Sequence, residues 1–249
     1  MTAFESISTW RRELPPPISA TRTALVDEVA TLIDDLGPDR LRIAVDGYTA
    51  AGKTSFGHEL ATAVRGLGTG RSTLRASFDD FKHPWRHSIE HGYDRTSGEG
   101  YFRNAPDFHS ARELLLRPAG PDGSGVVVLC AHDPLTGVDH RATTVTAPGD
   151  AVLIVDSVFA FRPEYDEFWD LRIWLDVSPE LSLRRGIDRD GDREGRAEAE
   201  RLHRDRYGVA EALYIDEVDP RRRADLVIDN TVLAAPRIVR RGSASAGPG

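Results

Sequence analysis

Residues 47–54 combine the residue types and the spacing of a loop that binds phosphate groups. They read Gly-Tyr-Thr-Ala-Ala-Gly-Lys-Thr and fit the pattern G-x-x-x-x-G-K-[ST] at every fixed position. In such a loop, backbone N–H groups wrap the phosphates, the lysine reaches the β- and γ-phosphates, and the last hydroxyl binds Mg²⁺. The pattern predicts that the chain binds a nucleoside triphosphate. The predicted nucleotide-binding residues are Gly47, Tyr48, Thr49, Ala50, Ala51, Gly52, Lys53, Thr54 and Ser55.

The surroundings of this loop support the prediction. The apolar run 41–45 precedes it and residues 56–61 follow with helical spacing, which gives the strand–loop–helix context of the motif. The chain has only one other lysine, Lys82, so a lysine at the position that requires a compact ammonium group is hard to attribute to composition. The alternative is a glycine-rich turn that binds nothing.

A carboxylate ends a second apolar run. Residues 151–155 predict a strand, and Asp156 follows it directly. Open α/β sheets bind their ligands at the carboxyl ends of the strands, where Asp156 could hold Mg²⁺ directly or through a water molecule. The alternative is a carboxylate that only begins a turn.

Two adjacent carboxylates, Asp79 and Asp80, follow another predicted strand at 72–78. The acceptor hydroxyl in phosphoryl transfer needs a carboxylate that orients it and accepts its proton. Because neighbouring side chains alternate in direction along an extended chain, we expect only one of the two to face the site. An acidic turn without a chemical role is the other interpretation.

Arginines are dense in a predicted helical segment from 179 to about 214. Arg185 and Arg189 are four residues apart and share one helix face, and further arginines follow. Guanidinium groups suit the negative charge of a phosphoryl group in transfer. We therefore predict a lid at about 184–206 that closes over the site and excludes water. The alternative is a solvated helix face, because acidic residues alternate with these arginines.

Candidates for binding the acceptor lie between the predicted strands at 72–78 and 126–130 and directly after the second of these. The ring of Tyr101 could stack on a base, and Asp107 or Asp133 could bind sugar hydroxyls. His132 lies next to Asp133. For each of these residues taken singly, a structural role is the alternative.

Three histidines, His83, His87 and His91, recur at four-residue spacing. A helix would bring them onto one face, but Pro84 argues against a helix through this segment. We expect them to be loop residues and not metal ligands.

The composition limits the class of protein. A chain of 249 residues suits one α/β domain, and a net charge of −8 argues against a general nucleic-acid binder. The single cysteine, Cys130, excludes an intrachain disulfide. No apolar run approaches ~18 residues, so we expect no membrane span. The polar N-terminus lacks the pattern of a signal peptide, and we expect a cytoplasmic protein.

Strands that alternate with helices predict a parallel, doubly wound sheet. Residues 1–18 are predicted to be an arm that ends in prolines, and Ser19 is predicted to begin a helix. The segments 126–130 and 143–145 predict a small hairpin. We place one domain at 19–235 and a disordered tail at 236–249, which is basic and then rich in Gly, Ser and Ala.

Taken in order, these segments resemble uridine kinase and its relatives, which include phosphoribulokinase and bacterial pantothenate kinase. The resemblance covers roughly 41–231 and implies the three-layer sandwich of P-loop NTPases, with ATP as phosphoryl donor. The segments that carry it are Gly47–Thr54, Ser77–Phe81, Gly98–Phe102, Asp156–Phe159, Arg185–Asp190 and Tyr214–Asn230.

The resemblance also implies roles for single residues. Asp79 matches the family's catalytic base, and Thr54 and Asp156, together with Asp79, match its magnesium environment. Lys53, Arg185 and Arg189 complete the catalytic set. Asp107 and His132 fall near the family's contacts to sugar and base.

The expected reaction is therefore transfer of a phosphoryl group from ATP to the 5′-hydroxyl of a pyrimidine nucleoside. One alternative is a kinase for another small alcohol, such as a pantothenate-like, sugar-phosphate or antibiotic acceptor. A second alternative is an ATP-binding regulatory protein that transfers no phosphoryl group. The sequence leaves a homo-oligomer open.

Overall fold

The computed structural model describes residues 2–10 and 19–242. Within them, seven strands form one sheet in the order β1-β3-β6-β2-β7-β8-β9, and all neighbours are parallel except β8 and β9. The predicted parallel, doubly wound sheet is confirmed. The strands are β1 (Ala3–Glu5), β2 (Leu41–Gly47), β3 (Thr73–Ser77), β6 (Val152–Asp156), β7 (Leu171–Asp176), β8 (Leu226–Asp229) and β9 (Arg237–Arg241).

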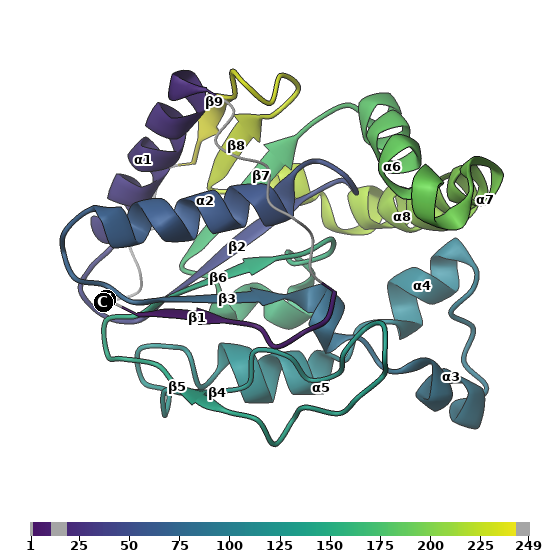
Figure 1. The fold of residues 1–249 in the computed structure, drawn as a ribbon, viewed down its shortest axis with the longest axis horizontal. Coiled ribbons are helices and arrows are strands. Elements are labelled where there is room, and N and C mark those ends of the chain that lie inside the picture. Colours follow the sequence, from purple (N-terminus) through teal and green to yellow (C-terminus); the bar gives the residue numbers. More distant parts are fainter. Residues whose placement is uncertain (1, 11–18, 243–249) are drawn as a thin grey trace.

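The sheet is covered on both faces, which explains its continuous apolar strands. Along β2, Ile43 and Val45 pack under α1 (Ala20–Asp34) and α2 (Lys53–Gly66), whereas Ala44 joins the core on the opposite face. Figure 1 shows these two helices on one side of the sheet and α5 (Phe108–Ser110) with the hairpin on the other. This alternation along each strand produces the three layers.

The predicted start of the first helix is confirmed. Ser19 lies at the N-cap of α1, where its hydroxyl accepts a hydrogen bond from the Arg22 backbone N–H at 3.1 Å. The predicted hairpin is also present, as the short antiparallel strands β4 (Val126–Val127) and β5 (Val145–Thr146).

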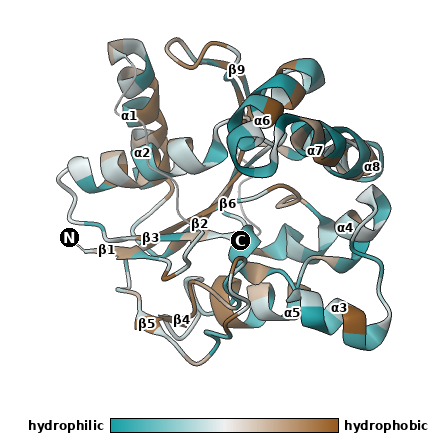
Figure 2. Ribbon diagram, turned by 45° about the vertical axis from the view of Figure 1, so that its right-hand side comes forward, coloured by the Kyte–Doolittle hydropathy of each residue, from teal (hydrophilic) through white to brown (hydrophobic). Residues whose placement is uncertain are grey.

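The arginine-rich segment is helical, as predicted, and lies beyond the carboxyl ends of the strands (Figure 1). It bends at Gly195, whose φ of +82° favours glycine. The residues of its first two helices are mostly hydrophilic, in contrast to the strands at the sheet centre (Figure 2). The elements are α6 (Pro179–Glu194), α7 (Arg196–Arg201), the π-helix η4 (Leu202–Tyr207), α8 (Gly208–Val218) and the short α9 (Pro220–Arg223).

Short helices lie in the connections from β3 to β6 and from β6 to β7. The prediction that His87 and His91 lie in a loop is wrong, because both belong to α3. Pro84 precedes the first turn of that helix, where a missing N–H removes no hydrogen bond. The connecting elements are η1 (Phe78–Phe81), α3 (Trp85–His91), α4 (Gly98–Asn104), the π-helix η2 (Ala111–Leu116) and η3 (Pro163–Phe168).

Both ends of the described chain contribute strands, which the sequence did not predict. The disorder prediction is wrong for residues 237–241, because β9 pairs with β8 and its Ile238 packs against the core under α1 and α2. The arm likewise supplies β1, which pairs with β3 at the other edge of the sheet. The proline run at 15–17 and the end of the tail at 243–249 lie outside the described residues.

Of the helices in the described residues, none has the length and the apolar character that a membrane span requires.

Candidate phosphoryl-transfer site

The phosphate loop connects β2 to α2, as its sequence predicted. A Cβ added at Gly47, whose φ is +152°, would lie 2.6 Å from the Leu175 carbonyl oxygen of β7. At Gly52, with φ of +96°, it would lie 2.9 Å from the Asn230 amide nitrogen. Only glycine fits both places, so the fixed glycines of the pattern let the loop pass close to β7 and to the residue that follows β8.

Lys53 begins α2 and is held by the loop itself. Its Nζ donates hydrogen bonds to the carbonyl oxygens of Gly47 at 2.9 Å and Tyr48 at 2.7 Å. Burial lowers the pKa of Lys53, and the nearby carboxylates of Asp46, Glu211 and others oppose that shift. The ammonium group is thus fixed within the loop and surrounded by carboxylates.

Thr54 and Asp156 meet at the carboxyl edge of the sheet. The Thr54 hydroxyl donates to Asp156 Oδ2 at 2.9 Å, and Arg75 Nη2 donates to Asp156 Oδ1 at 2.5 Å. Mg²⁺ prefers one or two carboxylates together with hydroxyl, phosphate and water oxygens. This pair supplies such oxygens, and the residues present therefore fit the predicted magnesium environment.

Asp79 and Asp80 point to different neighbours. Asp79 Oδ1 accepts a hydrogen bond from Lys82 Nζ at 2.5 Å, and the residue is half-buried. Burial raises the pKa of Asp79, but Lys82, Lys53 and Arg189 outweigh that effect, so the pKa lies below the ordinary value. The carboxylate is ionised at neutral pH, as a proton acceptor must be.

Asp80 is turned toward the N-terminal segment instead. Its side chain is 2% exposed and accepts a hydrogen bond from the Ser6 hydroxyl at 2.7 Å. Burial raises the pKa of Asp80 to about 7. Of the two adjacent carboxylates, Asp79 is therefore the one on which the charges of Lys53 and Arg189 act.

The two predicted lid arginines have different surroundings. The positive charge of Arg189 acts on Asp79, while its guanidinium also pairs with Asp190 at 2.8 Å. Arg185 donates to the carbonyl oxygens of Asn230 at 3.3 Å and Thr231 at 2.8 Å. The charge of Arg189 thus acts on Asp79, whereas Arg185 binds the segment after β8.

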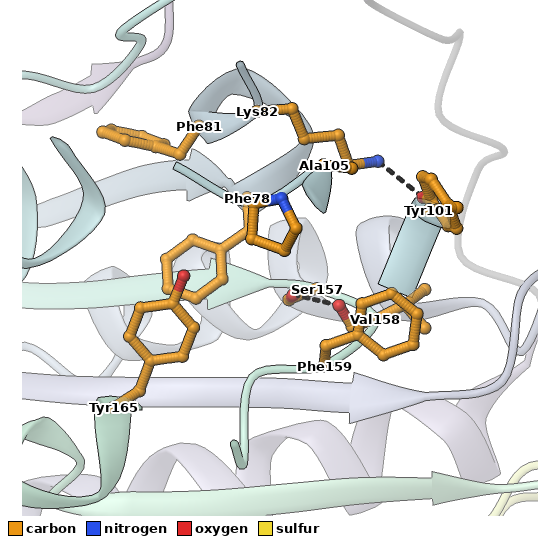
Figure 3. Close-up of a pocket in the computed structure, with 10 residues that line it drawn as sticks. Phe78, Phe81, Lys82, Tyr101, Ala105, Ser157, Val158, Phe159 and Tyr165 are labelled. Atoms are coloured by element: carbon orange, nitrogen blue, oxygen red, sulfur yellow. Dashed lines mark hydrogen bonds between the residues drawn. The ribbon is translucent and has the colours of Figure 1, made fainter. Parts of the chain in front are cut away.

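A small cavity lies beside Asp79, with apolar walls that include Phe78 and Tyr165 (Figure 3). Lys82 also lines it and donates to the Tyr101 hydroxyl at 2.7 Å. The cavity holds about 20 Å³, which is room for about one water molecule and not for a sugar ring. Tyr101, predicted from sequence to bind substrate, thus belongs to the group around Asp79.

The other predicted acceptor residues have mainly local partners. Asp107 caps α5 and accepts hydrogen bonds from Ser110, and Asp133 accepts four from its own loop and from Thr9. His132 is 8% exposed, and its Nδ1 has no hydrogen-bond partner among the described residues. Asp107 and Asp133 make no contact with Asp79 or Lys53 in the part of the chain that the structure describes.

One buried group at the site was missed from the sequence. Asp46, the last residue before the loop, is fully buried and accepts hydrogen bonds from the N–H groups of Gly47 at 2.7 Å and Ala160 at 2.8 Å and from the Tyr214 hydroxyl at 2.6 Å. Phe159, which precedes Ala160, has a strained φ of +86°. Asp46 thus connects the phosphate loop, the turn after Asp156 and α8. The sequence did contain a signal for this role, because Asp46 is an ionisable residue at the end of an apolar run.

Helices of the arginine-rich segment also hold the loop directly. Glu211 of α8 accepts a hydrogen bond from the Thr49 N–H at 2.5 Å, and the Ser182 hydroxyl of α6 donates to the Thr49 carbonyl oxygen at 2.6 Å. Burial raises the pKa of Glu211. No local sequence pattern marks this contact, because its partners are far apart in the chain.

Replacing Tyr214 with phenylalanine should destabilise the protein by ~1–3 kcal/mol, since it leaves the buried Phe161 N–H without its acceptor and removes one of the hydrogen bonds to the buried Asp46 carboxylate. Burial raises the pKa of Asp46 from 3.8 to about 6 in the folded protein. Stability therefore falls as the pH rises through about 6, and Tyr214 limits the fall by donating to the ionised carboxylate. Urea unfolding should therefore show that Tyr214→Phe lowers the free energy of unfolding by more at pH 8 than at pH 5.

The matched control is Tyr93→Phe, at a position that is 50% exposed, which should leave the free energy of unfolding unchanged. An equal effect of Tyr214→Phe at both pH values would show that the hydroxyl does not stabilise the ionised form of Asp46.

Solved structures share this fold. A proposed fructose transport system kinase from Silicibacter sp. TM1040 superposes with a TM-score of 0.64 at 21% identity, covering 80% of this chain and 96% of that one. A possible uridine kinase from Bacillus stearothermophilus gives 0.61 at 23% identity over 83% and 96%. The YGR205w protein gives 0.57 at 12% identity over 89% and 100%. No family model and no curated protein matches the sequence.

The chain has the α/β fold of P-loop kinases related to uridine kinase. At these identities the likeness concerns the fold alone. The resemblance noted in the sequence is thereby confirmed for the fold, with its mostly parallel sheet and small antiparallel hairpin.

Proposed function

We propose that the chain is an ATP- and Mg²⁺-dependent kinase that transfers a phosphoryl group to a hydroxyl of a small molecule. The observation that carries the proposal is the position of Asp79. Its ionised carboxylate lies at the end of β3, within the electrostatic influence of Lys53 and Arg189. A protein that only binds a nucleotide needs the loop but not a carboxylate on the acceptor side.

Each part of the site would have a distinct task. Asp79 would orient the acceptor hydroxyl and take its proton, while Lys53 and Arg189 would face the negative charge that spreads over the transferred group. Closure of α6–η4 would bring Arg185 and Arg189 toward the phosphates and exclude water.

The nucleotide and the metal would be held by the loop and the edge of the sheet. The loop backbone and Lys53 would bind the phosphates of ATP, and Thr54 and Asp156 would hold Mg²⁺, with Asp79 nearby. The bound ion would neutralise charge on the phosphate oxygens. The buried Arg75 donates a hydrogen bond to the Asp156 carboxylate and orients it.

The first acceptor to test is a pyrimidine nucleoside at its 5′-hydroxyl, as the sequence resemblance implies. The fold likeness to a possible uridine kinase supports this choice. The likeness to a proposed fructose transport system kinase supports a different small alcohol. In either case we propose that Tyr101 and His132 contact the acceptor. Asp107 and Asp133 would hold the loops around it.

A panel of nucleosides and small alcohols with Mg²⁺ and ATP tests the proposal, with product phosphate detected by mass. We expect one acceptor class to gain a phosphoryl group at a rate well above ATP hydrolysis. Binding of ATP without a phosphorylated product from any acceptor would instead favour the regulatory protein that the sequence leaves as an alternative.

A further inference from the structure

Two arginines that pack against Trp85 have no carboxylate partner in the part of the chain that the structure describes. Within the described residues, neither Arg95 nor Arg206 forms an ion pair, and the Nε of each is buried without a hydrogen-bond acceptor. Arg95 is only 5% exposed, and the one hydrogen bond that its side chain makes to the described residues goes to the His83 carbonyl oxygen. Arg206 is half-buried in η4.

These two cations contact the same aromatic ring, and the charge of one acts on the other. Their Cζ atoms lie 4.6 Å (Arg95) and 5.4 Å (Arg206) from the centre of the same indole ring, that of Trp85. Burial lowers the pKa of Arg95, and the like charge of Arg206 lowers it further. Contact with aromatic rings offsets only part of the cost of burying a charge without a counter-charge. The two guanidinium charges therefore lack a counter-charge among the described residues, and a bound anion would supply it.

The pair is connected to the proposed base through a single aromatic ring. The Tyr101 ring centre lies 4.6 Å from Arg206 Cζ and 4.8 Å from Lys82 Nζ. Lys82 in turn binds both the Tyr101 hydroxyl and Asp79 (Figure 3 shows the first of these contacts). A small molecule at Tyr101 could therefore reach Asp79 with one end and the two arginines with the other.

We propose that the acceptor is a small alcohol that carries a phosphate monoester, which Arg95 and Arg206 bind while a hydroxyl of the same molecule meets Asp79. A phosphate monoester carries about −1.5 to −2 charges at pH 7 and can balance both guanidinium groups, whereas a carboxylate balances one. Planar guanidinium forks also match the oxygens of a phosphate. This inference rests on the proposed function and narrows its acceptor class. It ranks a phosphate monoester first and a neutral nucleoside second.

Binding to the protein saturated with ADP tests the anion site without turnover, because ADP occupies the phosphate loop. The probes are ribose 5-phosphate, ribonate and ribose, which share a carbon skeleton and differ in charge, measured by calorimetry at constant ionic strength. We expect ribose 5-phosphate to bind at least about tenfold more tightly than ribose. Arg206→Met and Arg95→Met should remove this preference, and Arg95→Lys should retain part of it because it keeps the charge.

Two other arginines serve as matched controls. Arg86 is 84% exposed on α3, and Arg204 is 57% exposed and pairs with Glu200. Arg86→Met and Arg204→Met remove the same charge from nearby positions and should leave the preference intact. Circular dichroism of each variant checks that it folds, and Arg206→Met serves if the substitution at the buried Arg95 prevents folding.

Equal affinity for ribose 5-phosphate and ribose in the unmodified protein would overturn the inference. A preference for ribonate as strong as that for the phosphate would overturn the assignment to a phosphate monoester. If ribose 5-phosphate binds through the arginines but no acceptor gives a product with ATP, the anion site stands and the kinase proposal fails. If uridine is phosphorylated equally well by the unmodified protein and Arg206→Met, the kinase stands and this inference fails.

Discussion

Asp79→Asn should lower kcat by at least ~10² while leaving the affinity for ATP unchanged. The substitution keeps the size of the side chain but removes the negative charge that accepts the proton. Lys82, which now pairs with that carboxylate, would lose its only anionic partner among the described residues. Turnover with a saturating acceptor measures kcat, and binding of a fluorescent ATP analogue measures the nucleotide affinity.

A suitable control for this variant is Asp122→Asn, at an exposed position remote from the loop in sequence. It removes the same charge and should retain the kcat of the unmodified protein. Near-normal turnover of Asp79→Asn would refute the assignment of Asp79 as base. Loss of ATP affinity in the same variant would instead point to a role at the metal.

Lys53→Ala should abolish most turnover and also weaken ATP binding. Its ammonium group is buried at the loop, where removing one buried donor to a reacting group costs ~10²–10³ in rate. The same charge attracts the nucleotide phosphates in the ground state. This double effect distinguishes Lys53 from Asp79, for which we expect only the rate to change.

Lys53→Met preserves more of the side-chain volume and separates the loss of charge from the loss of packing. Thermal unfolding of both variants without nucleotide shows whether the loop remains folded. The carboxylates of Asp46 and Glu211 lie near Lys53, so the lost charge should raise the pKa of both groups. Unaltered kinetics in either variant would contradict the role of the phosphate loop.

The sequence predicted those parts of the site that depend on neighbouring residues in the chain. The loop, the strand before it and the helix after it form one local unit. Asp156 could be placed at the sheet edge because a buried strand must end there. The hydrogen bond between Thr54 and Asp156 then follows from the parallel pairing of β2 with β6.

The sequence could not predict contacts that depend on how distant elements pack. Glu211 is 162 residues from Thr49, and Tyr214 is 168 residues from Asp46. Nor could alternation along a strand decide between Asp79 and Asp80, because both belong to η1, whose turn sets their directions. The strand β9 was missed because its basic composition is that of a solvated tail, although β8 offers it a pairing edge.

The two strands at the margins of the sheet have a practical consequence for handling the protein. β1 covers one side of β3, and β9 covers one side of β8. If either marginal strand detached, a row of unpaired backbone groups would be exposed, and such rows promote association between chains. Affinity tags or truncations close to residues 3–5 or 237–241 therefore carry a risk of aggregation that is unrelated to the chemistry of the site.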